Sequence, residues 1–313
     1  MLRLSTRCNS ACGHCTVADV PATDERSPKQ ALAELLAARK RGCDELVIMR
    51  GEPTLRPDLP YLARAARRLG YRLVQIQTNG RMLCYEPYLD RLTAAGVDFF
   101  EVALFGATAS THDAISGEAG AYAQTIAGLR LLAARPPLGH LVSVSILAAN
   151  LGELLATVEL VADLGLRRIQ FNFTRPVRVD GRWRTDPLAR LDDAGPPLRD
   201  ALRRARALGI AASTEAVPLC QLDPEDRPAA ETARDFVDVA VVDLHRRHAS
   251  FAAHHREVRP LPDGCVQCCV AGVCPTTWAA YQKLFGTGEL RPLASPDAAA
   301  MSVSPACRSH PRS

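Results

Sequence analysis

The sequence predicts an α/β protein built on an open, partial (β/α)6 barrel of the TIM-like type, followed by a small cysteine-rich domain at the C-terminus. Strand-like and helix-like segments alternate from residue 2 to about residue 173 and supply six strands, fewer than the eight of a closed barrel. A second group of cysteines follows between residues 220 and 274. A doubly wound sheet is the alternative that the alternation alone leaves open.

The six predicted strands are short, mostly apolar runs, and most of them end in polar or glycine-containing turns. Such runs suit parallel strands that are buried on both faces and joined by right-handed helical crossovers. Because ligands bind at the carboxyl ends of such strands, the turns that follow them are where functional residues are expected. The predicted strands cover residues 2–6, 46–49, 73–77, 98–104, 141–147 and 168–173.

Helical periodicity fills the intervals between these strands. Apolar residues recur three or four positions apart, and proline or glycine marks the ends of several runs. The predicted helices follow Pro28 and Pro57 or cover residues 87–95, 121–134 and 151–162. After the fourth strand, residues 107–113 and Gly117 resemble a loop.

The pattern changes after Pro176. Residues 178–197 are rich in Asp, Arg, Gly and Pro and are expected to form a linker or long loop. A basic helix over 198–208, a strand over 210–217 and mostly helix over 229–255 are expected next. The predicted domains are the partial barrel (1–175), a linker with a bridging helix (176–219), a cysteine-rich domain (220–292) and a loose tail (293–313).

Composition narrows the class of protein. The 313 residues are 47% hydrophobic, enough for a large core, yet no run reaches the ~18 apolar residues that cross a bilayer. Cys8 comes too early for a secretion signal, so we expect a cytoplasmic protein without a membrane partner. The net charge of +4 gives no support for a nucleic-acid partner. Eleven cysteines in a reducing compartment favour metal or cluster binding over disulfides, with Cys43 and Cys84 as incidental thiols.

The stretch from Cys8 to Cys15, CNSACGHC, carries the strongest functional signal. Cys8, Cys12 and Cys15 are separated by three and then two residues, directly after the first predicted strand. These short separations make three thiolates converge, which suits three corners of a [4Fe–4S] cluster and leaves the fourth iron without a protein ligand from the loop. A structural zinc loop or free thiols are the alternatives.

This spacing resembles the signature of the radical SAM superfamily, whose core fold is also a (β/α)6 partial barrel. The resemblance implies that Cys8, Cys12 and Cys15 bind the cluster and that its open iron chelates the amino and carboxylate groups of S-adenosylmethionine (SAM). It further implies that an electron from the cluster cleaves SAM to a 5′-deoxyadenosyl radical. His14 occupies the position where the family usually has an aromatic residue near the adenine.

The turns after the second and third predicted strands extend the resemblance. Gly51-Glu52-Pro53 alone is a weak motif, but a glycine lets the backbone approach a ligand and a carboxylate accepts hydrogen bonds from an amine. In this place it resembles the family's Gly-Gly-Glu-Pro motif, which holds the methionine amino group, with Arg50 in place of the first glycine. Thr78-Asn79-Gly80, after the third predicted strand, resembles a motif that the family often has there, with an ordinary turn as the alternative.

Asn150 ends the fifth predicted strand. We expect it to contact the SAM ribose or carboxylate, to cap the next helix with Glu153 completing a capping box, or to do both. Gln170 and Asn172 share a face of the sixth strand, from which they could reach substrate or adenine. The sequence assigns no catalytic residue for the chemistry on the substrate.

The second cysteine group, Cys265-x2-Cys268-x5-Cys274, resembles the first three positions of the C-terminal cysteine run in SPASM-type radical SAM enzymes. Trp278 stands where that run has its next cysteine. The resemblance therefore implies a shorter, twitch-like domain with one auxiliary [4Fe–4S] cluster. Cys220 is the predicted fourth ligand, Cys269 and Cys307 are its rivals, and zinc is the alternative to iron and sulfide.

These motifs predict a radical SAM enzyme that oxidises or modifies a peptide or small molecule, assisted by the auxiliary cluster and by an electron donor such as flavodoxin or ferredoxin. Because the chain starts at the first strand, no separate N-terminal peptide-recognition domain is expected. The alternatives are a non-catalytic iron–sulfur or zinc-binding protein and an RNA-modifying radical SAM enzyme. The motifs at the strand ends argue against the first, and the modest charge and sparse aromatic residues argue against the second.

Overall fold

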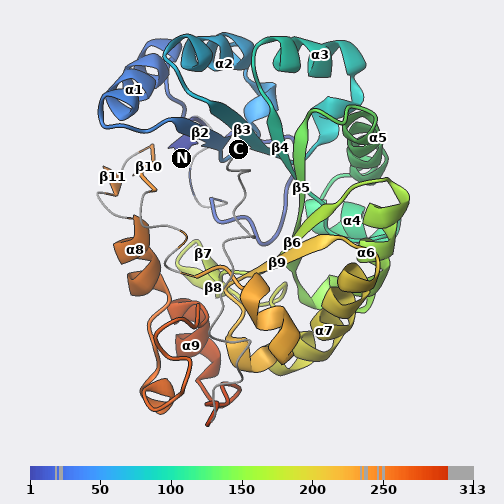
Figure 1. Ribbon diagram of the computed structural model, residues 1–313, viewed down its shortest axis with the longest axis vertical. Coiled ribbons are helices and arrows are strands. Elements are labelled where there is room, and N and C mark those ends of the chain that lie inside the picture. Colours follow the sequence, from blue (N-terminus) through green and yellow to red (C-terminus); the bar gives the residue numbers. More distant parts are fainter. Residues whose placement is uncertain are drawn as a thin grey trace. The chain divides into compact units, whose positions relative to one another are not determined.

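The computed structural model describes residues 1–17, 20, 24–232, 235, 239–244, 247–248 and 251–294 (Figure 1). The chain forms two compact units. The described residues of the first fall within Met1–Leu104, Thr108–Val142 and Val239–Ser250, and those of the second within Phe105–Ala107, Ser143–Asp238 and Phe251–Ser313. The domain boundaries predicted from the sequence stay a prediction.

The first unit holds a mostly parallel sheet with the strand order β11-β10-β1-β2-β3-β4, followed by the first half of β5. The pairs β10–β1, β1–β2, β2–β3 and β3–β4 are parallel, and the short pair β10–β11 is antiparallel. This arrangement confirms the predicted α/β class. The strands are β1 (Leu2–Arg3), β2 (Glu45–Met49), β3 (Leu73–Thr78), β4 (Phe99–Ala103), β5 (Gly139–Ile146), β10 (Val241–Val242) and β11 (Arg247–His248).

Helices connect these strands as the periodicity predicts. Figure 1 shows α1, α2 and α3 along one side of the first unit's sheet. Leu62 on α2 and Ile48 and Ile76 on the strands are fully buried, and each such side chain contributes roughly 1.5–3 kcal/mol. The elements are α1 (Pro28–Lys40), η1 (Pro53–Leu55), α2 (Leu59–Arg68), η2 (Arg81–Cys84), α3 (Glu86–Ala94), α4 (Ala109–Ser116) and α5 (Ala121–Ala133).

Helix α4 corrects the expectation of a loop over residues 107–113 and at Gly117. The side chain of Thr108 accepts a hydrogen bond from the backbone N–H of Thr111 and so caps the helix at its start. Gly117 ends it in the left-handed conformation, with φ of 70°. Both signals are present in the sequence, but the helix has only eight residues and few apolar positions to reveal its period.

His112 on α4 gives a testable pH dependence. Its ring is 2% exposed and packs edge-on against Tyr122, and burial lowers its pKa to about 4 from 6.5. The unfolded chain therefore takes up a proton below pH 6.5 that the folded chain does not take up until about pH 4, so stability falls across that window. We expect His112→Phe to reduce this loss by about 3 kcal/mol, measured by urea unfolding at pH 7, 5.5 and 4. An unchanged pH dependence would contradict the assignment.

The second unit contains the second half of β5, then β6 and β9, which pair in parallel. The predicted strand at 210–217 is therefore real and extends the sheet beyond the six predicted units. Its elements are η3 (Ala148–Glu153), α6 (Leu154–Asp163), β6 (Arg168–Phe173), β7 (Val177–Val179), β8 (Arg182–Arg184), α7 (Leu191–Ala207), β9 (Ala211–Glu215), η4 (Leu219–Gln221), η5 (Pro224–Ala229), α8 (Phe251–Val258), η7 (Asp263–Cys265) and α9 (Ala279–Phe285).

The expected linker at 178–197 is wrong in its first and last parts. Strands β7 and β8 form an antiparallel hairpin around Asp180-Gly181, and both turn residues have positive φ, 51° and 75°. An Asp-Gly pair between short β-prone runs is a hairpin signal that the polar composition obscured. Helix α7 also begins earlier than predicted, at Leu191, where two aspartates in the first turn favour a helix start despite the prolines that follow.

The expected helix over 229–255 is also wrong for most of its described residues. Val241 and Val242 form β10, which lies against β1, and α8 begins only at Phe251. Adjacent β-branched residues favour a strand, and the edge of the sheet beside β1 provides the partner. Among the described residues, no helix is both long and apolar enough to cross a membrane.

Candidate cluster and cofactor sites

The loop that follows β1 brings its three cysteines together. Burial raises the pKa of Cys12 to about 12, and the nearby Cys8 and Cys15 thiols add to this rise. The backbone N–H of Cys15 donates to the carbonyl of Cys12 at 3.1 Å, which closes the turn between them. In the described ranges no three His, Cys, Asp or Glu side chains already surround a metal-ion position. The loop thus offers three clustered thiols without a preformed single-ion site.

The turn after β3 holds this loop. The Asn79 side-chain amide donates to Oδ1 of Asn9 at 2.7 Å, and the Arg81 guanidinium donates to the backbone carbonyl of Asn9. Arg81 is itself fixed by its Nε, which donates to Gln124 at 2.7 Å. Thr78-Asn79-Gly80 is therefore more than an ordinary turn, and Arg81 is a supporting residue that the sequence reasoning missed.

The end of α4 supports the loop from another direction. The N–H of Ala11 donates to the carbonyl of Ser116 at 2.8 Å. A Cβ on Gly117 would lie 2.9 Å from the carbonyl oxygen of Ala11, so only glycine fits there. The sequence contains a signal for this contact, a glycine at the end of a short capped segment, but its partner is more than a hundred residues away.

Arg50 and Gly51 form a tight backbone approach to the chain that leaves β1. Both residues have positive φ, 74° and 56°, so Arg50 adopts the left-handed region that favours glycine. A Cβ on Gly51 would lie 2.5 Å from the carbonyl oxygen of Arg7. The next N–H, that of Glu52, donates to the same carbonyl at 2.6 Å. Gly51 therefore fixes the spacing between the cysteine loop and Glu52.

We expect Gly51→Ala to destabilise the chain by about 2 kcal/mol and to weaken SAM binding, because the new methyl group must push the Arg7 backbone away. Thermal unfolding and calorimetric titration with SAM would measure both effects. Gly272→Ala is the matched control, since its Cβ would meet no atom within 4 Å and its φ is not positive. Equal effects of the two changes would refute this role for Gly51.

Glu52 is 1% exposed and is surrounded by hydrogen-bond donors. Its Oε1 accepts from Thr54 N at 3.0 Å, Thr54 Oγ1 at 2.6 Å and Thr78 Oγ1 at 2.7 Å, and its Oε2 accepts from Asn79 N at 2.7 Å. Burial raises the pKa of Glu52, and these donors oppose that rise. Each carboxylate oxygen has about two lone-pair sites, and Oε2 accepts only from Asn79 N, so Oε2 keeps room for one further donor such as an ammonium group.

His14 lies inside the cysteine loop, between Cys12 and Cys15. Burial lowers its pKa to about 4, so the ring is neutral at neutral pH. A neutral imidazole has a flat, weakly polar face that can stack on a purine without placing a positive charge beside it. The ring thus suits the position next to adenine that was predicted for it.

Asn150 lies in the second unit and is 1% exposed. Its amide donates to the carbonyls of Phe105 and Ser145 at 2.9 and 2.8 Å, and its Oδ1 accepts from Leu147 N at 2.9 Å. The side chain therefore braces the end of β5, and both amide hydrogens are already used. Glu153, and not Asn150, is the N-cap residue of α6, and no capping box joins the two.

The polar residues of β6 also have partners. Asn172 donates to Oγ of Ser143 at 2.8 Å, and Gln170 donates to Glu231 at 3.4 Å. These contacts suit ordinary strand polar residues, and a role toward substrate or adenine stays a prediction.

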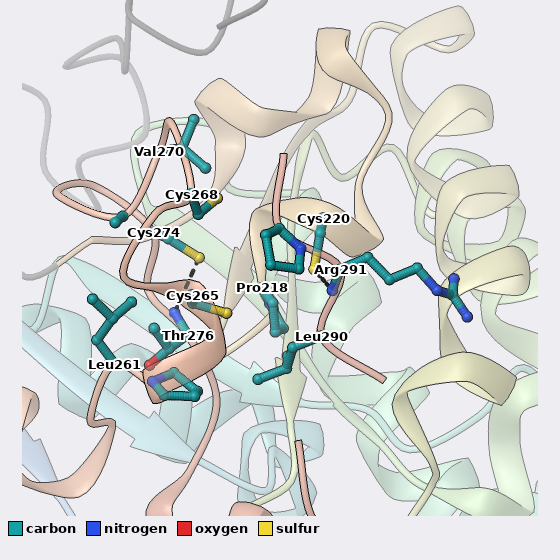
Figure 2. Close-up of a pocket in the computed structure, with 13 residues that line it drawn as sticks. Pro218, Cys220, Leu261, Cys265, Cys268, Val270, Cys274, Thr276, Leu290 and Arg291 are labelled. Atoms are coloured by element: carbon teal, nitrogen blue, oxygen red, sulfur yellow. Dashed lines mark hydrogen bonds between the residues drawn. The ribbon is translucent and has the colours of Figure 1, made fainter. Parts of the chain in front are cut away.

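The second cysteine group lines a pocket in the second unit (Figure 2). Sulfur atoms of Cys220, Cys265, Cys268 and Cys274 surround it, together with apolar residues such as Leu261. Burial raises the pKa of Cys274 to about 11, and Cys220 and Cys268 add to the rise. Sequence reasoning had placed these four cysteines at one site, and the structure brings them together.

Four thiols that converge on one pocket are a ligand set that an iron–sulfur cluster uses. A tetrahedral zinc ion uses the same set. The donor set therefore fits either group.

Of the rival ligands, Cys269 is exposed and does not line the pocket. Cys307 and residues 295–313 of the predicted tail lie outside the described residues.

Trp278, at the position of the missing cysteine, has a structural role. Its indole N–H donates to the carbonyl of Phe173, the last residue of β6, at 2.6 Å. The guanidinium of Arg259 lies 4.2 Å from its ring centroid and is paired with Glu215 at the end of β9. Trp278 thereby ties the cysteine-rich segment to the ends of two parallel strands.

The chain is therefore an α/β protein whose parallel strands carry a three-thiol loop and a buried glutamate at their carboxyl ends. The model of the Radical SAM superfamily matches residues 2–161, just over half of the chain, and the chain belongs to that family. Members of the family bind a [4Fe–4S] cluster and SAM.

Individual relatives are similar to part of this chain. The chain is 35% identical to an AdoMet-dependent heme synthase of Methanosarcina barkeri, over 52% of this chain and 46% of that protein. It is 30% identical to a PqqA peptide cyclase of Ruegeria pomeroyi over 76% and 58% of the two chains. The chain thus spans about half the length of these two relatives. Both relatives are enzymes, and this chain, as a member of the same family, is an enzyme too.

The fold is similar to that of SuiB of Streptococcus suis, solved with its precursor peptide SuiA. The TM-score is 0.57 at 17% identity, over 68% of this chain and 48% of SuiB. This similarity supports the predicted α/β fold and carries no argument about the substrate.

Proposed function

We propose that this chain cleaves SAM reductively at a [4Fe–4S] cluster held by Cys8, Cys12 and Cys15 and uses the resulting radical to modify a peptide. The observation that carries this proposal is that Gly51 and Glu52 both approach the carbonyl of Arg7, the residue before Cys8. The three thiols of the loop that follows lie near one another. A loop that only stores metal would not require Glu52, a buried carboxylate with one acceptor position left for an amine.

The protein residues bind and orient the cofactor. When bound, the cluster supplies the electron that breaks a carbon–sulfur bond of SAM to give a 5′-deoxyadenosyl radical. Oε2 of Glu52 would accept from the methionine ammonium, Gly51 would let the backbone come close, and His14 would stack near the adenine. A role of Asn150 in SAM binding stays a prediction.

The pocket of Cys220, Cys265, Cys268 and Cys274 is proposed to hold an auxiliary [4Fe–4S] cluster, with Cys220 as the fourth ligand. The four thiols that line the pocket support this assignment, and zinc is the alternative. It belongs to a proposed domain over 220–292, after a barrel over 1–175 and a linker with a bridging helix over 176–219.

A peptide is the proposed substrate because the PqqA peptide cyclase matches most of this chain, 76% of it. The heme synthase match favours a tetrapyrrole as the second candidate. A flavodoxin or ferredoxin is the proposed electron donor.

Anaerobic reconstitution with iron and sulfide tests the proposal. We expect iron for two clusters per chain and release of 5′-deoxyadenosine from SAM after reduction with dithionite. Adding any short peptide that proves to be encoded beside the gene, or a tetrapyrrole, should raise this release for the true substrate class. A chain that binds zinc in place of iron, or that leaves SAM intact, would refute the proposal.

A further inference from the structure

Residues 286–293, which follow α9, run along the second cysteine pocket and point two backbone N–H groups at its sulfurs. Arg291 N donates to Sγ of Cys220 at 3.4 Å, and Leu293 N donates to Sγ of Cys268 at 3.3 Å. The first of these bonds is visible in Figure 2. The segment thus contacts cysteines that are 71 and 25 residues away in the sequence.

Such bonds have a known consequence for a cluster. Reduction adds a negative charge that is spread over iron and sulfur, and an N–H dipole directed at a sulfur stabilises that charge. Each bond of this kind therefore raises the reduction potential, and its removal lowers it.

The segment is held by a carboxylate with several partners. Glu289 is 9% exposed, and it accepts from the Tyr281 hydroxyl at 2.5 Å and from Asp192 N at 3.3 Å. Arg190 pairs with the same carboxylate at 3.2 Å, and Gln221, next to Cys220, donates to the Glu289 carbonyl at 3.0 Å. This network fixes the backbone two residues before the first N–H donor.

The side chain of Arg291 makes a separate contact. Its Nη2 donates to both carboxylate oxygens of Asp192 at 2.9 Å, but the guanidinium is 65% exposed. An exposed pair contributes roughly 1 kcal/mol or less, so the side chain can be removed while the backbone N–H stays.

We propose that the N–H groups of Arg291 and Leu293, placed by Glu289, set the reduction potential of the auxiliary cluster. The inference rests on the proposed auxiliary cluster. In this proposal Glu289 is a positioning residue, and residues 286–293 have a redox role although they contribute no cluster ligand.

Proline substitution isolates each N–H, because proline has no backbone donor. Arg291→Pro is compared with Arg291→Ala, and Leu293→Pro with Leu293→Ala. All four are made in the full chain with Cys8, Cys12 and Cys15 changed to Ala, so that only the auxiliary cluster is loaded. Iron analysis confirms loading, and an anaerobic redox titration followed by electron paramagnetic resonance gives the midpoint potential.

We expect each proline variant to lower the reduced-to-oxidised ratio at a fixed potential by roughly tenfold relative to its alanine partner, which is ~59 mV for a one-electron couple. Equal potentials within each pair would overturn the inference. Loss of iron in both proline variants but in neither alanine variant would also overturn it, because the N–H groups would then retain the cluster and not tune it. Absence of iron from the parent chain would instead refute the auxiliary cluster itself.

Discussion

Replacing Cys12 with alanine is expected to abolish SAM cleavage. The remaining Cys8 and Cys15 cannot hold three irons of a cluster, and alanine, unlike serine, offers no oxygen as a substitute ligand. Release of 5′-deoxyadenosine should fall to the rate of a reaction without protein, and iron should fall to the amount of one cluster. Chromatography of the anaerobic reaction and a colorimetric iron assay measure the two quantities.

Cys43→Ala provides the control for this change. Cys43 is a partly buried free thiol that lies just before β2 and outside both cysteine groups. It should keep full iron and full cleavage. Cleavage by the Cys12 variant at more than the background rate would exclude the loop as the site of SAM chemistry.

Replacing Glu52 with leucine is expected to have the second largest effect. The change leaves the N–H groups of Thr54 and Asn79 without this acceptor in a buried place. Each unsatisfied donor costs about 1–3 kcal/mol, so we expect a loss of about 4 kcal/mol in the free energy of unfolding. SAM binding should be lost as well, since no carboxylate would face the ammonium group. Urea unfolding and calorimetry would measure these effects.

Two further variants separate stability from binding. Glu52→Gln keeps one acceptor oxygen and the shape of the side chain, so its free energy of unfolding should lie between those of the leucine variant and the parent chain. It should still bind SAM poorly. Glu86→Gln changes a side chain that is 61% exposed and should alter neither property. Parent-like SAM affinity in Glu52→Gln would show that the carboxylate charge has no part in binding.

The sequence predicted correctly those parts of the fold in which apolar residues recur with a regular period or a strong local signal marks the start or end of an element. Strands β2, β3, β4 and β6 are continuous apolar or alternating runs, and α1 begins at a capped proline, so their placement needs only local physics. The six-strand count and the parallel pairing follow from these runs.

The features that the sequence did not predict depend on residues far apart in the chain. Val241 and Val242 become a strand because β1 lies open beside them, and a two-residue strand has no period of its own. The Asp-Gly hairpin at residues 180–181 is an exception, because its turn signal is local.

The candidate sites show the same division. The cysteines and Glu52 are recognisable by spacing, whereas Arg81, Ser116 and Glu289 act through contacts across 72, 105 and 97 residues. Their residue types are ordinary and their positions follow no motif. Only the folded chain reveals that they hold the loop and the 286–293 segment in place.

The pairing of β10 with β1 fixes the order of events during synthesis. Residues 2 and 3 lie between β2 and a strand that is made about 240 residues later, and Arg3 is ion-paired with Asp243. At ~5–20 residues per second, a ribosome needs roughly 10–50 s to cover that distance. During this time the first three cysteines are outside the ribosome without their complete sheet. The sheet beside this loop is therefore completed only after residue 243 has been synthesised.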